Sequence, residues 1–116
     1  MNKATYPLKS QSPAAGEDTH VVASPCELGS VVVYNATGSD AYLLVFDAAA
    51  VIADGPFAAG TRLPLPPVLV PGTGSPTQSY DFAGVGMTRG VSCVLSTTAT
   101  QVTAAAGANR FLVTFR

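Results

Sequence analysis

The residues that could support catalysis or metal binding are few and lie far apart in the chain. The 116 residues include one histidine, His20, and two cysteines, Cys26 and Cys93. A zinc site needs about four ligands, usually in close Cys and His pairs, and a nucleophile needs a base within reach. This spacing satisfies neither requirement, so we expect no metal site and no cofactor. Because nothing indicates an oxidising compartment, both cysteines are predicted to be small buried apolar side chains rather than a disulfide.

Four aspartates form the other set of candidate groups. Asp40, Asp47, Asp54 and Asp81 flank predicted strands, where such side chains usually hydrogen-bond to nearby backbone groups in Asx turns. No local spacing brings two of them together as a general acid and base. Two alternatives stay open: two of these side chains could still meet in space as an acid–base pair, and loop carboxylates and carbonyls could form a calcium site. We therefore predict that the protein is not an enzyme.

Two short motifs resemble functional signatures without meeting their requirements. In the glycine-rich segment 84–90, Arg89 is the sole cation and no Lys-Ser or Lys-Thr follows, whereas a phosphate-binding loop needs that lysine and a following helix. Its glycines indicate a tight corner or a bulge between strands. The tripeptide Asn35-Ala36-Thr37 matches a glycosylation sequon. We expect no secretory signal, because residues 1–20 contain no apolar core of a signal peptide, and we interpret the tripeptide as a turn.

The low charge of the chain limits the classes of partner. Charged residues make up 11% of the sequence, against roughly a quarter in typical soluble proteins. The net charge is −1 and no basic block is present, so we expect no nucleic-acid partner. No apolar run reaches the roughly 18 residues of a transmembrane helix, so we expect no membrane association. A surface with so few charges favours association, and we predict a homo-oligomer or an assembly with other proteins.

Residues 21–116 have the pattern of an all-β domain. Short runs of Val, Leu, Phe, Tyr and Thr alternate with clusters of Gly, Pro, Asn and Asp, which predicts a compact antiparallel β-sandwich of about seven or eight strands, jelly-roll-like or Greek-key-like. Two alanine-rich runs, 48–53 and 102–107, are predicted to form short helical turns. The predicted strands are 19–23, 29–35, 41–47, 62–65, 67–70, 77–82, 91–98 and 110–116.

Alternation along the last two of these strands assigns their inward faces. In strand 91–98 one face carries Val91, Cys93 and Leu95, and the other carries Ser92, Val94 and Ser96. In strand 110–116 we expect Phe111, Val113 and Phe115 to face inward and Leu112, Thr114 and Arg116 to face outward.

The strand at 41–47 is apolar on both faces. Leu43 and Val45 share one face, and Tyr42, Leu44 and Phe46 share the other. A two-layer sandwich buries only one face of each sheet, so the second face needs another cover. That cover is either the chain's own loops or a neighbouring subunit. In the second case Tyr42, Leu44 and Phe46 are interface residues.

Residues 1–20 differ from the rest in composition. They hold both lysines, two prolines and the single histidine, and their apolar residues are sparse and without period. This composition predicts an extended N-terminal arm outside the core, with the β-sandwich domain at 21–116. An arm of this kind is expected to lie along a neighbouring subunit. Its predicted contact residues are Lys3, Tyr6, Pro7, Leu8 and Lys9.

Part of the sequence resembles a known group of proteins. The run VVVYNAT at 31–37, followed after a gap by AYLLVFD at 41–47, is similar to the opening of small virion structural proteins of tailed bacteriophages. In that group a small-residue loop, a Pro-flanked strand, a glycine corner and a strand ending in Ser/Thr repeats follow. The matching segments here are 48–60, 65–71, 80–82, 86–90, 91–98 and 111–114. One departure is Met87-Thr88, where the pattern has an aromatic residue.

The resemblance implies a β-sandwich that serves as a building block of the particle. We expect a capsid decoration, or cement, protein that binds the major capsid protein in the assembled shell and stabilises it by mass action. It would then be found in the virion, after assembly in the host cytoplasm. A tail, neck or fibre component is the first alternative. A carbohydrate- or receptor-binding β-module is the second, although that function needs exposed aromatics in a groove and the chain has no tryptophan.

Overall fold

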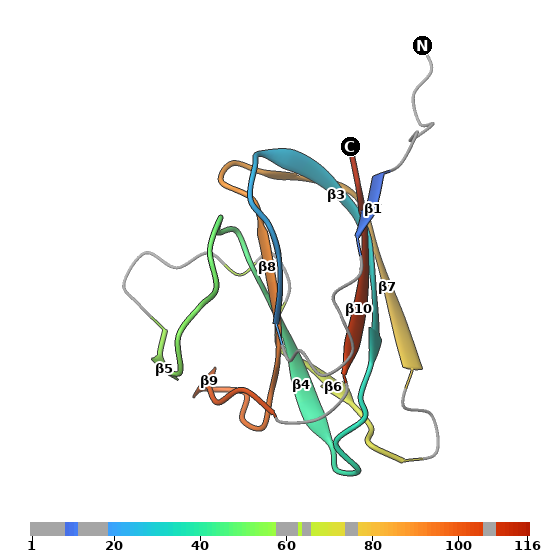
Figure 1. Ribbon diagram of the computed structural model, residues 1–116, viewed down its shortest axis with the longest axis vertical. Helices are drawn as coiled ribbons and strands as arrows, with labels where there is room; N and C mark the ends of the chain where they lie inside the picture. Colours follow the sequence, from blue (N-terminus) through green and yellow to red (C-terminus); the bar gives the residue numbers. More distant parts are fainter. Residues whose placement is uncertain (1–8, 12–18, 58–62, 64–65, 74–76, 106–108) are drawn as a thin grey trace.

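The computed structural model describes residues 9–11, 19–57, 63, 66–73, 77–105 and 109–116, and every structural statement below concerns these residues. They form ten β-strands, and no helix occurs among them (Figure 1). Consistent with this, the described part of the chain contains no helix able to span a membrane. The predicted all-β fold class is confirmed.

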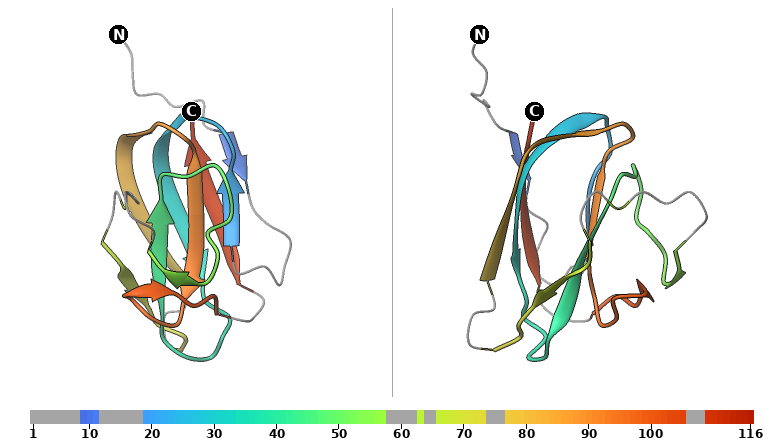
Figure 2. Two further views of the ribbon diagram at one scale, coloured as in Figure 1. Left: turned by 90° about the vertical axis from the view of Figure 1, so that its left-hand side faces the viewer. Right: turned by 180° about the vertical axis from the view of Figure 1, so that it is seen from behind.

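Eight of the strands form two four-stranded antiparallel sheets that face each other (Figure 2). Sheet A contains, in spatial order, β1 (Lys9–Gln11), β10 (Arg110–Phe115), β3 (Cys26–Tyr34) and β7 (Thr77–Met87). Sheet B contains β2 (Thr19–Val22), β8 (Val91–Ser96), β4 (Ala41–Phe46) and β6 (Val68–Val70). The remaining two, β5 (Gly55–Pro56) and β9 (Gln101–Val102), pair only with each other.

The strand pairs are nested around the connection between β4 and β6. β4 pairs with β6, β3 with β7, β2 with β8, and β1 with β10, and each pair is antiparallel. Two further pairs, β10 with β3 and β8 with β4, join the nested pairs into the two sheets. The chain is therefore arranged as one long hairpin wound into two layers.

Seven of the eight predicted strands correspond to observed ones. The eighth, 62–65, lies mostly outside the described residues, and Leu63, its one described residue, is not in a strand. β7 runs further than predicted, to Met87, so that Gly84 lies inside it at a positive φ of 92°. The register between β3 and β7 shifts between Leu28 and Ser30. Gly84 therefore belongs to a bulge and Gly90 to the turn that follows, as the sequence indicated, whereas Gly86 pairs with Glu27 in the ladder.

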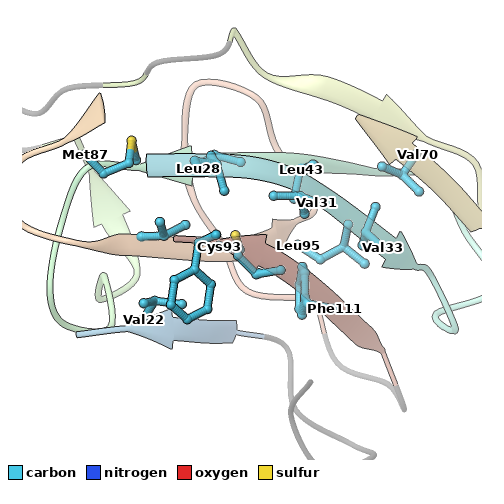
Figure 3. Packing of buried hydrophobic residues seen from close by; sticks show 14 of the residues in the cluster. Val22, Leu28, Val31, Val33, Leu43, Val70, Met87, Cys93, Leu95 and Phe111 are labelled. Atoms are coloured by element: carbon cyan, nitrogen blue, oxygen red, sulfur yellow. The ribbon is translucent and has the colours of Figure 1, made fainter. Parts of the chain in front are cut away.

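The main hydrophobic core fills the space between the two sheets (Figure 3). The predicted inward faces of the last two long strands are confirmed, because Val91, Cys93, Leu95, Phe111 and Val113 are all buried there. The side chains that β3 and β4 contribute to the same cluster are Leu28, Val31, Val33, Leu43 and Val45.

A second, smaller core lies on the other side of sheet B. Leu44 and Phe46 of β4 are 0% and 1% exposed, and they pack with Val94 and Val102. Ile52, Phe57 and Leu63 also pack against this cluster, and the rings of Phe46 and Phe57 meet edge to face at 5.6 Å. Of the two covers that the sequence left open, the chain's own loops are the one observed.

The loops that form this cover are not helical. Residues 48–53 contain no helix, and Val102 belongs to β9, so the predicted helical turns at 48–53 and 102–107 are wrong for their described parts. Residues 106 and 107 lie outside the described residues. An alanine-rich run of one or two turns has little intrinsic stability as a helix. In the run 48–53 the packing of Ile52 against the second core determines the conformation instead. In the run 102–107 the pairing of β9 with β5 does so.

The described parts of the predicted N-terminal arm lie in the sheets. Lys9–Gln11 form β1, which pairs with β10 at the edge of sheet A, and Thr19–Val22 form β2, which pairs with β8. The rest of the segment, 1–8 and 12–18, lies outside the described residues. We expected residues 1–20 to form an arm outside the core, and Lys9–Gln11 differ from this expectation because they are a strand of sheet A. Pairing with β10 gives their backbone groups partners, which composition alone does not reveal.

Candidate functional site

Asp47 holds together two turns that are far apart in sequence. It directly follows β4, and its carboxylate accepts hydrogen bonds from the backbone N–H groups of Thr88 (3.1 Å), Arg89 (2.9 Å) and Gly90 (3.5 Å) and from the Thr88 hydroxyl (3.0 Å). Burial by itself raises the pKa of Asp47, but these hydrogen bonds outweigh burial and lower the pKa to about 2. The carboxylate thus acts as a charged acceptor that joins the two turns.

Two other aspartates also bind the backbone of remote loops. The N–H of Ala104 donates to Asp54 Oδ1 at 3.1 Å, and the N–H of Gly72 donates to Asp40 Oδ1 at 3.3 Å. With Asp47, these contacts join segments that are 32 to 50 residues apart. We predicted local Asx turns for these aspartates, and that prediction is wrong for these hydrogen bonds, because their donors are remote in sequence. Since the partners are distant in sequence, no local signal could have identified them.

The asparagine of the sequon does form an Asx turn. Asn35 Oδ1 accepts the backbone N–H of Thr37 at 2.9 Å, and its side-chain nitrogen donates to the carbonyls of Ser39 and Val70 at 2.8 and 2.9 Å. Asn35 is also buried, with 1% of its surface exposed. The interpretation of this tripeptide as a turn is confirmed. Its amide nitrogen is engaged in the fold and cannot serve as an acceptor for a sugar without opening the loop.

Ser96 organises the loop that follows β8. Its hydroxyl donates to the carbonyl of Thr98 or Gln101, and it accepts the N–H groups of Thr98 (3.2 Å) and Thr103 (3.0 Å). Ser96 is fully buried, so these bonds satisfy a polar group inside the protein. They keep the segment that carries Val102 against sheet B.

Both cysteines are free thiols with little nucleophilic character. Burial raises the pKa of Cys93 to about 12, and burial, with a smaller contribution from the charge of Asp47, raises the pKa of Cys26. Because the thiolate is the reactive form, neither thiol is activated. His20 lies in β2 at the register position opposite Cys93. Among the described residues, no group of three or more His, Cys, Asp or Glu side chains is placed to hold a metal ion.

The predicted interface residues divide into three groups. Lys3, Tyr6, Pro7 and Leu8 lie outside the described residues, and Lys9 begins β1. The structure brings Tyr42, Leu44 and Phe46 together on one face of β4, but the chain's own loops bury Leu44 and Phe46. Tyr42 alone of these three is half-buried.

An exposed side chain that the sequence analysis did not single out lies beside Tyr42. Leu69 of β6 is 49% exposed and is the cross-strand neighbour of Tyr42. Alternation in β6 could have identified it, because Val68 and Val70 then belong to the opposite face.

The outer face of sheet A, in contrast, is open in the described part of the chain. Tyr34 of β3 is 41% exposed and Leu112 of β10 is 40% exposed, and Val32 lies half-buried directly opposite Leu112. At one end of this face, Arg116 Nε donates to Glu27 Oε1 at 2.7 Å. The outward position of Leu112 was predicted from alternation and is confirmed.

The geometry of the described residues has three features. Its polar side chains join loops, its thiols are protonated, and one of its two sheet faces is open. Comparison with known proteins adds no relative, because no protein-family model, curated protein or solved structure matches this chain.

Proposed function

We propose that this protein is a structural subunit of a tailed-phage virion, and specifically a capsid decoration protein that binds the assembled shell and stabilises it. In this proposal its partner is the major capsid protein, it forms a homo-oligomer, and it resides in the virion. A ligand that binds only the assembled shell shifts the equilibrium toward that shell by mass action.

The observation that carries the proposal is the nested order of strand pairs. Pairing of β4 with β6, β3 with β7, β2 with β8 and β1 with β10 supports assignment of the sandwich to the jelly-roll class. Jelly rolls recur in viral capsid proteins. The resemblance of residues 29–116 to small phage virion proteins leads independently to the same type of protein. Fold analogy is a weak argument by itself, so the agreement of these two arguments is what favours the proposal.

The arrangement of polar groups also suits a structural role. Asp47 and Asp54 each use their carboxylate to bind the backbone of a remote loop. Such contacts restrain the loops, and restrained loops lose less conformational entropy when they bind a partner. A cement protein, whose binding energy must add to the stability of a shell, benefits from this property.

The test is to measure where the protein occurs and how many copies are present. Particles purified from cells that express the gene are banded on a density gradient, and the protein is quantified by mass spectrometry against the major capsid protein. We expect the protein to band with the particles, in copy numbers on the order of hundreds, because a shell repeats its binding site over the whole surface. Particles that lack the gene should lose their genome at a lower temperature, and addition of the purified chain should restore their resistance.

Other results would contradict the proposal in distinct ways. A protein that stays in the soluble fraction would refute any virion role. Copy numbers of a few dozen or fewer would refute the decoration role and favour the tail, neck or fibre alternative, in which subunits form rings. The carbohydrate-binding alternative has less support, because among the described residues Tyr34 is the one strongly exposed aromatic side chain.

A further inference from the structure

We propose that the outer face of sheet A is a self-association surface, on which a second copy of this chain packs with its own sheet A. The twofold axis of this dimer runs parallel to the strands, between β10 and β3. The inference deepens the homo-oligomer of the proposed function by assigning its contact surface. It also stands on its own evidence, since it needs no other virion protein.

The register of sheet A arranges its outward side chains in rows. One row contains Arg110, Tyr34 and Thr77, and the next contains Leu112, Val32 and Ser79. A third row contains Thr114, Ser30 and Asp81. Each row crosses β10, β3 and β7 in that order.

Rotation about the proposed axis places each row opposite the same row of the second copy. It also places β10 of one copy over β3 of the other. Leu112 of one copy then meets Val32 of the other, which places apolar side chains at the centre of the interface. In the adjacent row, Arg110 meets Tyr34 of the other copy, and an Arg guanidinium stacks favourably on an aromatic ring. Face-to-face sheets in sandwiches keep their strand directions within about 30° of each other, so the rows of the two copies stay close to alignment.

Several polar side chains of this face already have partners within the chain. The hydroxyls of Ser30 and Thr114 are hydrogen-bonded to each other at 2.5 Å, and Arg116 is paired with Glu27. Asp81 lies on β7, at the edge of the sheet and away from the proposed axis. An apolar centre with charges at the rim, together with Tyr and Arg, is the composition of protein interfaces.

A second copy fits this face better than it fits sheet B. The chain's own loops already cover the part of the outer face of sheet B that carries Leu44 and Phe46, and they leave Leu69 exposed beside Tyr42. Two of the four large exposed hydrophobic side chains in the described residues, Tyr34 and Leu112, lie in adjacent rows on the open face. Of the other two, Val51 lies in the loop between β4 and β5, and Leu69 lies on β6. In a twofold dimer the patch of one copy packs on the same patch of the other, so a single interface buries both.

The first experiment measures the oligomeric state of the full chain by sedimentation equilibrium over a range of concentrations. We expect a dimer for the wild type. Leu112→Arg should raise the dissociation constant by at least about tenfold, because it places two extra cations at the centre of the interface. The matched control is Leu69→Arg, which introduces the same side chain at a similarly exposed leucine on sheet B and should leave the dimer intact. Circular dichroism and thermal melting verify that both variants fold.

The second experiment tests the axis. Leu112→Glu and Val32→Lys should each weaken the homodimer, whereas an equimolar mixture of the two variants should form a heterodimer in which the introduced carboxylate of one chain faces the introduced ammonium group of the other. A wild-type chain that is monomeric at all concentrations would overturn the inference, as would equal effects of the two arginine variants. Failure of the mixture to associate would refute the proposed axis. A stable dimer absent from particles would refute the proposed function only, and a monomeric chain found in particles would refute this inference only.

Discussion

Replacement of Asp47 by asparagine should destabilise the fold by removing the charge that binds the turn between β7 and β8. Hydrogen bonds from Arg89, Thr88 and Gly90 outweigh the effect of burial and lower the pKa of Asp47 from 3.8 to about 2. At about 1.4 kcal/mol per pKa unit, the shift corresponds to at most about 2 kcal/mol of stability, because solvent screens part of the interaction. Asparagine has nearly the same shape, but its amide nitrogen cannot accept a hydrogen bond. We expect Asp47→Asn to lower the free energy of unfolding by about 1–2 kcal/mol at neutral pH.

The pH dependence of this loss identifies the carboxylate as its cause. A group whose pKa is lower in the folded state stabilises the protein above its unfolded pKa, and the contribution disappears as the pH falls through the folded pKa. Urea unfolding of the wild type and of Asp47→Asn should therefore differ by a constant amount from neutral pH down to about pH 4. Between about pH 4 and pH 2 the wild type should lose stability and the difference should approach zero.

A second aspartate provides the control for this experiment. Asp40 is exposed and accepts a single long hydrogen bond, from Gly72, so Asp40→Asn should change stability by less than about 0.5 kcal/mol. Equal losses for the two variants would show that the hydrogen bonds of Asp47 contribute no more than a surface contact. A difference between wild type and Asp47→Asn that stays constant down to about pH 2 would exclude the charge as its origin.

Three further substitutions test the packing. Leu44→Asp should unfold the chain rather than only change its association, because the chain's own loops bury Leu44 and an unpaired buried charge costs several kcal/mol. A circular dichroism spectrum that retained the native strand signal would contradict this prediction. Cys93→Ala should lower the free energy of urea unfolding by about 1–2 kcal/mol through the cavity it leaves. A reducing agent should not change the stability of the wild type, because both thiols are free. A large effect of the reducing agent would indicate a disulfide. Gly90→Ala should lower the melting temperature, because a Cβ there would collide with the carbonyl oxygen of Val22. The control Gly86→Ala, whose Cβ would meet nothing within 4 Å, should have little effect, and equal shifts would refute the steric argument.

Hydrophobic alternation predicted the strands and their faces because it depends only on neighbouring residues. Val91, Cys93 and Leu95 point into the core as their spacing required, and Leu112 points outward. The double apolar face of strand 41–47 also correctly indicated that something covers Leu44 and Phe46. It could not identify the cover, since Phe57 and Val102 reach that face through loops whose paths depend on the whole fold.

The hydrogen-bond partners of the aspartates were the part that the sequence could not predict. Asp47 looked like a local turn residue, but its partners lie 41 to 43 positions further along the chain. In the same way, the composition of residues 1–20 predicted an arm, and nothing local indicated that Lys9–Gln11 would pair with the last strand. Both errors have one origin, which is that a hydrogen bond between remote segments leaves no periodic trace in either of them.

The nested strand pairs also determine the order in which this protein can fold. β10 lies between β1 and β3 in sheet A, so β1 has no strand partner and β3 has one open edge until residues 110–115 have been synthesised. Sheet A therefore cannot be completed during translation of the preceding part of the chain, and its N-terminal strand must wait for its partner. Folds dominated by such distant pairings form in about milliseconds to seconds, far more slowly than helical bundles. During that interval a weakly charged chain with unpaired strand edges is prone to aggregate. We therefore expect the highest yield of folded protein at a low expression level, which keeps the concentration of unfolded chains low, and at low temperature.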